Sequence, residues 1–125
     1  MPGELILIVE DNPRNLKLIR DVLQYQGYTT LEAETAEAGI TLALERQPAL
    51  ILMDVQLPGT DGSTAMKALK ADASTQRIPI IAMTAQAMKG DQERLLAEGF
   101  DGYISKPIAI KEVGKTIEGY LSGQL

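Results

Sequence analysis

Short apolar runs alternate along the chain with longer segments in which apolar residues recur every three or four positions. The short runs predict strands at about residues 5–9, 28–31, 49–54, 79–83 and 102–104. The longer segments have the period of helices that bury one side. Strands and helices in this alternation favour a parallel sheet covered by helices on both faces. Because no linker, repeat or low-complexity stretch interrupts the five units, we predict a single α/β domain over residues 1–125.

Cap residues indicate where the helices begin and end. Asn12 before Pro13 is a start signal, because asparagine caps free backbone amides and proline suits the first helical position. Further boundaries are expected at Thr35 and Asp61 for helix starts, at Gly27, Pro48 and Gly99 for helix ends, and at residues 110–121 for the last helix. The residues expected on the buried stripes are Leu16, Ile19, Leu23, Ala36, Ile40, Ala43, Leu44, Ala65, Met66, Leu69, Met88, Leu95 and Leu96.

Composition excludes several kinds of chemistry. The chain has no histidine and no cysteine, which rules out Ser–His and Cys–His catalysis, disulfides and zinc sites of the usual ligand types. A net charge of −5 argues against a nucleic-acid surface. No apolar run approaches the ~20 residues that span a bilayer, and the first residues lack a secretion signal, so we expect a cytoplasmic protein. Carboxylates, hydroxyls and lysines remain as the reactive groups.

Three carboxylates follow the two most apolar predicted strands. Glu10 and Asp11 end the first run, and Asp54 ends the third. If these strands are parallel neighbours, the three side chains meet at the carboxyl edge of the sheet, where doubly wound folds bind their ligands. Like charges at such spacing require compensation by a raised pKa, a cation or a basic side chain. Thr84 and Lys106, which follow the fourth and fifth strands, are expected at the same edge.

These residues carry a family resemblance. Taken singly, Asp11 and Asp54 are equally consistent with a helix cap and a turn. The set Glu10–Asp11, Asp54, Thr84 and Lys106–Pro107, in this order over essentially the whole chain, resembles the receiver domains of two-component response regulators. The segments 53–58, 83–91 and 103–108 look most like single-domain regulators of the DivK type and receiver modules of hybrid kinases. The resemblance implies a flavodoxin-like (CheY-like) fold with strand order 2-1-3-4-5, five helices, and phosphoryl transfer from a kinase histidine to aspartate.

The resemblance also implies a role for each residue. Asp54 is the expected phosphoryl acceptor, a carboxylate that forms an acyl phosphate. Lys106 is expected to pair with Asp54 at rest and to hold a phosphoryl oxygen afterwards, while the Thr84 hydroxyl binds another. Mg²⁺ is the expected cofactor, because it prefers oxygen ligands and bridges protein to phosphate. The expected metal ligands are Asp11, Asp54 and the backbone carbonyl of Gln56 directly, and Glu10 through a bound water.

Two further features concern communication with partners. Receivers couple phosphorylation to their surface through an aromatic residue, here Tyr103, whose rotamer changes as the loop at Thr84 moves. The alternative is that Tyr103 is half-buried only for packing. The resemblance implies in addition a cis peptide bond between Lys106 and Pro107.

The first helix carries a candidate docking site. Leu18 lies about 160° round the helix from Leu16, which places it outside the buried stripe. We expect Leu18 to be exposed and, with Arg14 and Asn15, to be a docking contact for a kinase or phosphotransfer helix. An isolated exposed leucine is also ordinary on protein surfaces.

We therefore predict a stand-alone response regulator in a phosphorelay that is not a turnover enzyme on an external substrate. Its expected partners are a histidine kinase or histidine phosphotransfer protein and a downstream protein target, with no nucleic acid and no membrane. We expect a monomer that could dimerise on phosphorylation. The alternatives are an aspartate-nucleophile, Mg²⁺-dependent phosphatase, a flavin-binding module, and a receiver module excised from a hybrid kinase. The adjacent acids of Glu10–Asp11 disfavour the phosphatase, which presents Asp-x-Asp, and repel the phosphate of a flavin.

Overall fold

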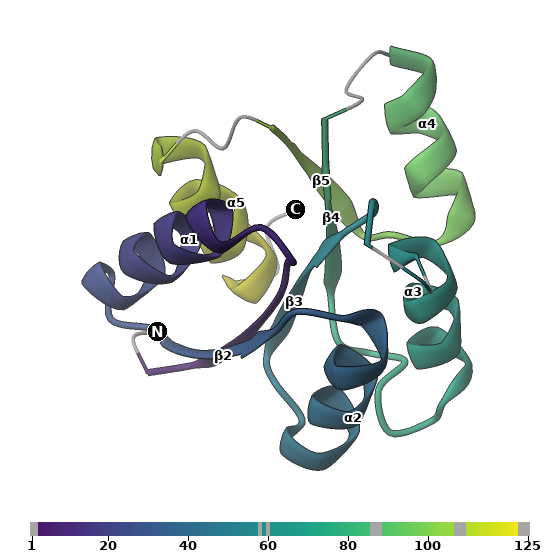
Figure 1. Ribbon diagram of the computed structural model, residues 1–125, viewed down its shortest axis with the longest axis horizontal. Helices are drawn as coiled ribbons and strands as arrows, with labels where there is room; N and C mark the ends of the chain where they lie inside the picture. The colour runs from purple at the N-terminus through teal and green to yellow at the C-terminus, as the bar shows by residue number, and fades with distance from the viewer. Residues whose placement is uncertain (1–2, 58, 60, 86–88, 107–109, 123–125) are drawn as a thin grey trace.

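The computed structural model describes residues 3–57, 59, 61–85, 89–106 and 110–122. Its strands are β1 (Leu5–Val9), β2 (Thr29–Ala33), β3 (Leu50–Asp54), β4 (Ile80–Thr84) and β5 (Gly102–Ser105). Its helices are α1 (Pro13–Tyr25), α2 (Ala36–Arg46), α3 (Gly62–Ala71), α4 (Lys89–Glu98) and α5 (Ile110–Ser122). Strands and helices alternate as the sequence predicts (Figure 1). Met88, predicted on a buried stripe, and the bond from Lys106 to Pro107, predicted to be cis, lie outside the described residues.

The five strands form one parallel sheet in the order β2-β1-β3-β4-β5, which confirms the predicted flavodoxin-like fold. Because the strands are parallel, their carboxyl ends lie at one edge. In the register, Val9 pairs with Met53, Asp54 with Met83, and Thr84 with Ser105. The carboxyl ends of four neighbouring strands therefore meet at one edge of the sheet, which we call the functional edge. It carries Glu10, Asp11, Asp54, Thr84 and Lys106.

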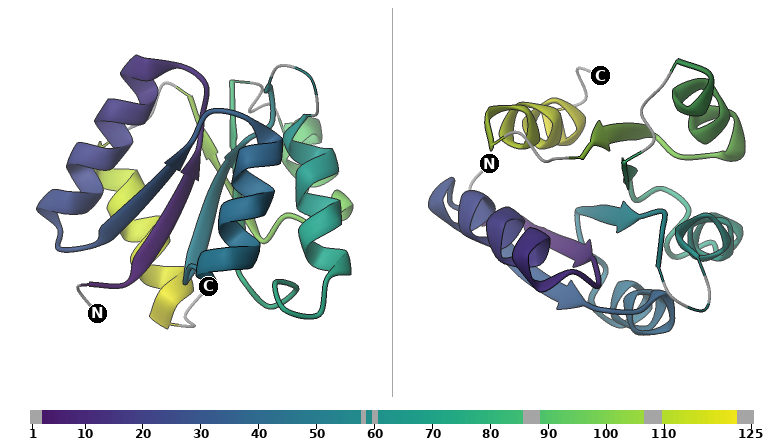
Figure 2. Two further views of the ribbon diagram at one scale, coloured as in Figure 1. Left: turned by 60° about the horizontal axis from the view of Figure 1, so that its bottom comes forward. Right: turned by 45° about the horizontal axis from the view of Figure 1, so that its top comes forward.

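The sheet separates two hydrophobic clusters. Helices α1 and α5 cover one face, and α2, α3 and α4 cover the other (Figures 1 and 2). Side chains alternate along each strand, so β1 gives Ile6 and Ile8 to the α1–α5 side and Leu7 and Val9 to the other. Strands buried on both faces require continuous apolar sequence, which explains the two runs that end at Glu10 and Asp54. None of the described helices is long and apolar enough to cross a membrane.

The predicted helix starts are confirmed by cap hydrogen bonds. The Asn12 side chain accepts bonds from the backbone amides of Arg14 and Asn15 at 2.9 and 3.3 Å. The Thr35 hydroxyl and the Asp61 carboxylate cap α2 and α3 in the same way. Helix α1 therefore starts directly at the functional edge, two residues after Asp11.

Several details differ from the sequence-based expectation. Strand β2 extends to Ala33 instead of ending at residue 31, because an edge strand tolerates polar residues such as Glu32. Leu44 and Leu96 are exposed instead of buried. The buried side of α2 is centred on Ala36, Gly39 and Ala43, since the lack of a side chain at residue 39 lets the helix approach Val9. Leu44 is thereby turned toward solvent.

The prediction that Leu18 is exposed is wrong. Leu18 is half-buried and packs against the cluster that contains Leu16, Val113 and Ile117. The physical reason is that α5 lies beside α1 and covers a wider part of that helix than the sheet alone would cover.

Candidate functional site

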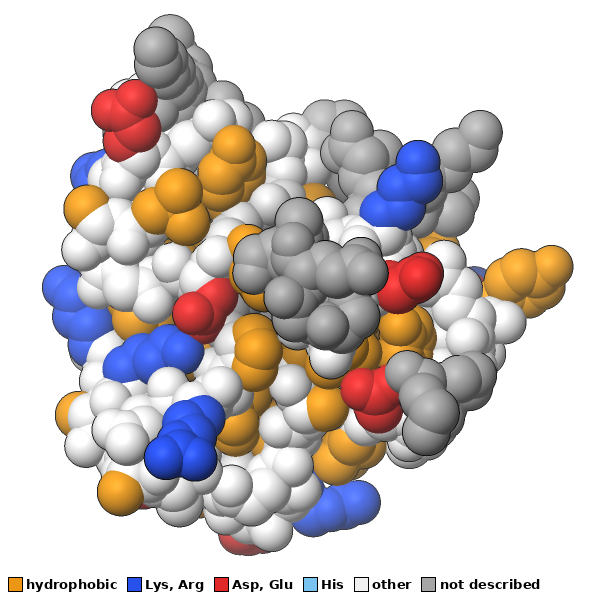
Figure 3. All heavy atoms as spheres, turned by 180° about the vertical axis from the view of Figure 1, so that it is seen from behind, with side chains coloured by type: hydrophobic (Ala, Val, Ile, Leu, Met, Phe, Trp, Pro, Cys, Tyr) orange, Lys and Arg blue, Asp and Glu red, His pale blue; other side chains and the backbone are white. Residues whose placement is uncertain are grey.

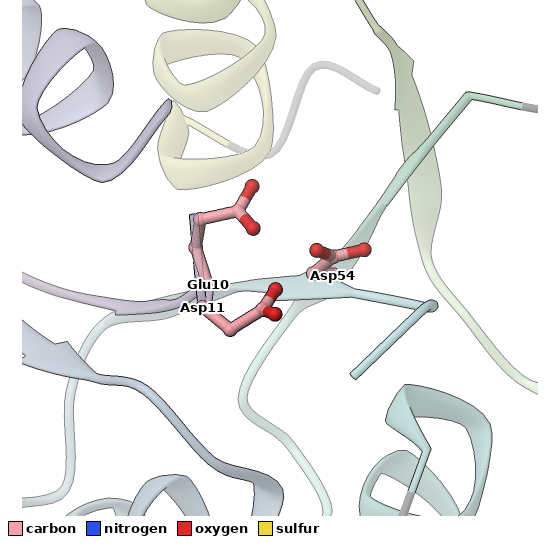
Figure 4. A group of neighbouring side chains, drawn as sticks. All are labelled: Glu10, Asp11 and Asp54. Carbon is pink, nitrogen blue, oxygen red and sulfur yellow. The ribbon is translucent and has the colours of Figure 1, made fainter. Parts of the chain in front are cut away.

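Three carboxylates from β1 and β3 point into the same space at the functional edge (Figure 4). Glu10 and Asp11 follow β1 directly, and Asp54 is the last residue of β3. One carboxylate oxygen from each residue lies within 4.8 Å of one from each of the others. Glu10 and Asp54 are almost fully buried, whereas Asp11 is exposed. The structure thus brings together the three acids that the sequence places at this edge.

Lys106 supplies the positive charge that this cluster requires. Its Nζ atom lies 2.9 Å from Oδ2 of Asp54, to which it donates a hydrogen bond, and 3.0 Å from Oε1 of Glu10. The backbone fixes the lysine at the end of β5, because its amide donates a 2.8 Å bond to the carbonyl of Thr84. Thr84 itself is buried as the last residue of β4. Four of the predicted site residues are therefore in one constellation, with Thr84 on the adjoining strand.

Backbone amides orient the two buried carboxylates. The amide of Gln56 donates a 2.9 Å hydrogen bond to Oδ1 of Asp54. The amide of Asn12 donates a 3.2 Å bond to Oε2 of Glu10. Both donors belong to the turn that follows the respective strand, so the loops hold the acids in place. In the sequence, Asn12 is recognisable only as a helix cap, so the bond from its backbone amide to Glu10 was not predicted.

The electrostatics of the cluster are unbalanced when only Lys106 is present. Burial, followed by the proximity of Asp54, raises the pKa of Glu10 from 4.5 to about 7, although Lys106 acts in the opposite direction. Burial alone would lower the pKa of Lys106, but the hydrogen bond and charge of Asp54, aided by Glu10, outweigh it and raise that pKa. One lysine therefore does not fully compensate the buried carboxylates, and further positive charge is favourable at this site.

The raised pKa of Glu10 predicts a specific dependence of stability on pH. Between pH 4.5 and about 7, the unfolded chain has lost the Glu10 proton while the folded chain retains it. The free energy of unfolding should therefore fall as pH rises through this window, by roughly 2–4 kcal/mol in total. Urea unfolding without divalent cations at several pH values should show this fall in the wild type and not in Glu10→Gln.

The matched control for this experiment is Glu45→Gln, at an exposed position of α2. This variant should follow the pH dependence of the wild type. Parallel curves for the wild type and Glu10→Gln across the window would contradict the assignment of the raised pKa to Glu10.

Helix α3 fixes the backbone of Asp54 from the other side. Gly62, in the first turn of this helix, is buried against the strand end, where a Cβ atom would lie 2.2 Å from the carbonyl oxygen of Asp54 and 2.9 Å from Cα of Val55. These neighbours are backbone atoms, so they cannot turn aside as a flexible side chain would. The absence of a side chain at residue 62 therefore permits the observed position of Asp54.

Gly62→Ala should displace Asp54 and destabilise the fold. We expect the free energy of unfolding to fall by about 1–3 kcal/mol, as for other overpacked sites. Gly90→Ala is the control, since a Cβ at Gly90 meets nothing within 4 Å and alanine favours a helix. Equal stability of the two variants in urea unfolding would contradict this role of Gly62.

The donor set fits a hard divalent cation. Mg²⁺ takes oxygen ligands and usually retains several waters, which suits two buried carboxylates next to an exposed one. Oε1 of Glu10 is buried and accepts no hydrogen bond of good geometry from the described residues, its 3.0 Å contact with Lys106 being an ion pair. An unsatisfied buried oxygen of this kind is stabilised by a cation or by a water bound to one.

The other predicted residues lie in the turn after β3, in α1 and in β5. The side chain of Gln56 is exposed next to Asp54, and Arg14 and Asn15 occupy the first turn of α1 close to the functional edge. Tyr103, in β5, is half-buried and donates a hydrogen bond to Gln92 of α4 at 2.8 Å. Sequence reasoning missed Gln92, whose signal is its position three residues before the buried Leu95.

Comparison with known proteins relates this arrangement to one family. The sequence model of the response regulator receiver domain family matches residues 6–118 of this chain. The polar-differentiation response regulator DivK of Brucella ovis is 47% identical over 116 residues, which are 93% of this chain and 94% of that protein.

Solved structures show the same similarity. The receiver domain of sensor histidine kinase PA1611 from Pseudomonas aeruginosa, described with a magnesium ion coordinated in the active site cleft, is 34% identical. It has a TM-score of 0.89 over 96% of this chain and 98% of that one. The signal receiver domain of a signal transduction histidine kinase from Syntrophus aciditrophicus is 30% identical, with a TM-score of 0.88 over 97% and 92% of the two chains.

Proposed function

Since the chain belongs to the response regulator receiver family, as its sequence predicts, we propose that it is a stand-alone regulator phosphorylated on Asp54. The phosphoryl donor is a phosphohistidine of a histidine kinase or of a histidine phosphotransfer protein. A receiver domain is not an enzyme on an external substrate. The phosphorylated protein then hydrolyses the phosphoryl group on Asp54 and so returns to the resting state. The observation that carries the proposal is the pairing of the buried Asp54 with Lys106 at 2.9 Å beside Glu10 and Asp11.

The chemistry follows from these positions. An oxygen of Asp54 attacks phosphorus in line with the breaking phosphorus–nitrogen bond, and the imidazole leaves with the bonding electron pair. Lys106, already in contact with Oδ2, moves its ion pair to a phosphoryl oxygen, and the hydroxyl of Thr84 donates to another. Asp11, Asp54 and the carbonyl of Gln56 would hold Mg²⁺ directly and Glu10 would hold it through a water, and the ion would supply positive charge to offset that of the transferring group.

The test is intact-mass measurement of the wild type after incubation with phosphoramidate, with Mg²⁺ and with a chelator. We expect one added phosphoryl group with Mg²⁺ and none without it. No adduct under either condition would overturn the proposal. Sustained release of phosphate from a general phosphatase substrate would instead favour the phosphatase that the sequence left as an alternative.

We propose that the phosphorylated form acts through protein partners in the cytoplasm. On the face opposite to that of Figure 1, Lys and Arg side chains lie at separate places with Asp and Glu among them (Figure 3). A net charge of −5 and this mixed surface favour protein partners over nucleic acid. The proposed switch consists of Thr84 and Tyr103, and the resting protein is proposed to be a monomer.

The docking surface is proposed to include Arg14, Asn15 and Leu18, at the end of α1 next to Asp54. Leu18→Asp should slow phosphoryl transfer from the partner about tenfold, the effect of removing a moderate contact, without changing phosphorylation by phosphoramidate. The control is Val22→Asp, which is also half-buried but one turn farther from the functional edge. Equal slowing with both donors, or equal slowing by both variants, would contradict the docking role.

A receiver module of a hybrid kinase is the second candidate, because the solved relatives include receiver domains of histidine kinases. DivK, of which this chain covers 94%, supports the stand-alone form. The mass of the native protein isolated from its host distinguishes the two candidates, since a hybrid kinase would carry this domain in a much longer polypeptide.

A further inference from the structure

Tyr103 and Gln92 join the sheet to helix α4. The tyrosine hydroxyl donates a hydrogen bond to Oε1 of Gln92, with 2.8 Å between the two oxygens. Both side chains are half-buried, so the bond is partly shielded from water. Gln92 lies one turn before the buried Leu95, and positions three apart share a helix face. The amide of Gln92 is therefore on the side of α4 that faces the sheet.

The tyrosine ring and the end of β4 lie on the same face of the sheet. Tyr103 pairs with Ala82, and Ser105 pairs with Thr84. Because side chains alternate along strands, these four project to one side. That side is the one that α4 covers, since Leu95, Ala82 and Tyr103 belong to one cluster. Thr84 and Tyr103 therefore project to the same face of the sheet from adjacent strands.

Helix α4 has few other specific attachments among the described residues. It packs chiefly on β5, whereas α1 packs with α5 and α2 with α3 (Figure 1). The ion pair between Lys67 of α3 and Glu98 of α4 is long, at 3.9 Å, and its lysine is exposed. Exposed pairs of this kind contribute little. Among the described residues, the bond between Gln92 and Tyr103 is therefore a directional link between α4 and the sheet.

We propose that Gln92 is a positioning residue for Tyr103. It holds the tyrosine hydroxyl at α4 while Asp54 is unmodified and thereby opposes the rearrangement that a phosphoryl group on Asp54 favours. This inference rests on the proposed function, because it concerns the response to phosphorylation. A contact made only in the resting state weakens the apparent binding of any ligand that selects the other state.

The experiment uses beryllofluoride with Mg²⁺ as a mimic of the phosphoryl group. The full chain is labelled with fluorotyrosine, and the ¹⁹F resonance of Tyr103 is assigned with Tyr103→Phe. In Gln92→Leu, which removes the acceptor, we expect the Tyr103 resonance to lie part of the way toward its bound position before any ligand is added. The concentration of beryllofluoride for half saturation should fall roughly 2- to 10-fold, as for the loss of one hydrogen bond.

Two further variants make the result specific. Gln92→Glu retains an acceptor oxygen and should restore the wild-type resonance and affinity. Glu93→Leu, at an exposed neighbouring position of α4, should leave both unchanged. Tyr103→Phe removes the bond from the other side, so adding Gln92→Leu to it should produce no further change in affinity.

The outcomes separate this inference from the proposed function. If the wild type binds beryllofluoride and its Tyr103 resonance moves, but Gln92→Leu has unchanged or weaker affinity, the role of Gln92 is overturned and the proposed function stands. A further gain in affinity when Gln92→Leu is added to Tyr103→Phe would also overturn it. If neither protein binds beryllofluoride, the proposed function fails as well.

Discussion

Asp54→Asn is expected to lose all Mg²⁺-dependent phosphorylation. Asparagine has nearly the same shape, and its Oδ1 can still accept the hydrogen bond that Asp54 receives from the amide of Gln56 at 2.9 Å. The amide cannot form an acyl phosphate, and it lacks the charge that pairs with Lys106 at 2.9 Å. Intact-mass measurement with phosphoramidate should therefore detect one phosphoryl group on the wild type and none on the variant.

The fold of this variant should remain intact. Replacement of Asp54 removes a charge that repels Glu10, so the stability near neutral pH should be maintained. Asp72→Asn is the control, because Asp72 is an exposed acid at the far end of α3. It should be phosphorylated like the wild type. A phosphoryl group on Asp54→Asn would place the acceptor at another residue.

Lys106→Met is expected to produce the largest loss of stability. Methionine retains much of the length of the side chain but leaves Glu10 and Asp54 buried together without their cation. Removing one partner from a buried ion pair typically costs several kcal/mol. Because 18% of the Lys106 side chain is exposed, we expect a decrease of roughly 2–4 kcal/mol in the free energy of unfolding, measured with a chelator above the Glu10 pKa.

The pH and metal dependence identify the cause of this loss. Below the Glu10 pKa of about 7, that carboxyl is protonated in the folded state, so the loss should be smaller. Mg²⁺ should recover part of it by supplying positive charge, and should stabilise the variant more than the wild type. Lys17→Met removes an exposed ion pair with Asp21 of 2.7 Å and should leave stability nearly unchanged, because exposed pairs are screened by solvent. A loss from Lys106→Met that is independent of pH and of Mg²⁺ would indicate a packing defect instead.

The elements of the fold could be predicted because their signals are local. The caps at Asn12, Thr35 and Asp61 act on amides two or three residues away, and the structure has helix starts at all three. The apolar runs ending at Glu10 and Asp54 could be identified as central strands, since only burial on both faces requires continuous apolar sequence. Parallel strands bring their last residues to one edge of the sheet, so the meeting of the acids at that edge could also be predicted.

Predictions failed where a neighbouring element decided the outcome. Leu44 was expected on the buried side of α2. The close approach of Gly39 to Val9 instead turns the buried side of the helix away from Leu44. Leu18 was expected outside, but α5 covers it in part. Helical period identifies an apolar stripe, while its width and centre depend on which elements pack against the helix.

The sequence by itself determined the order of the elements, the sign and kind of the groups at the functional edge, and the exclusion of histidine and thiolate chemistry, because these depend on composition and on local periodicity. Only the tertiary structure decided how the charges compensate one another. Lys106 contacts both Asp54 and Glu10, and Tyr103 bonds to Gln92, so these interactions join residues from separate strands and helices. The burial that raises the pKa of Glu10 likewise comes from several elements packed together. Distances across the fold set the strength of such interactions, and no local pattern in the chain encodes those distances.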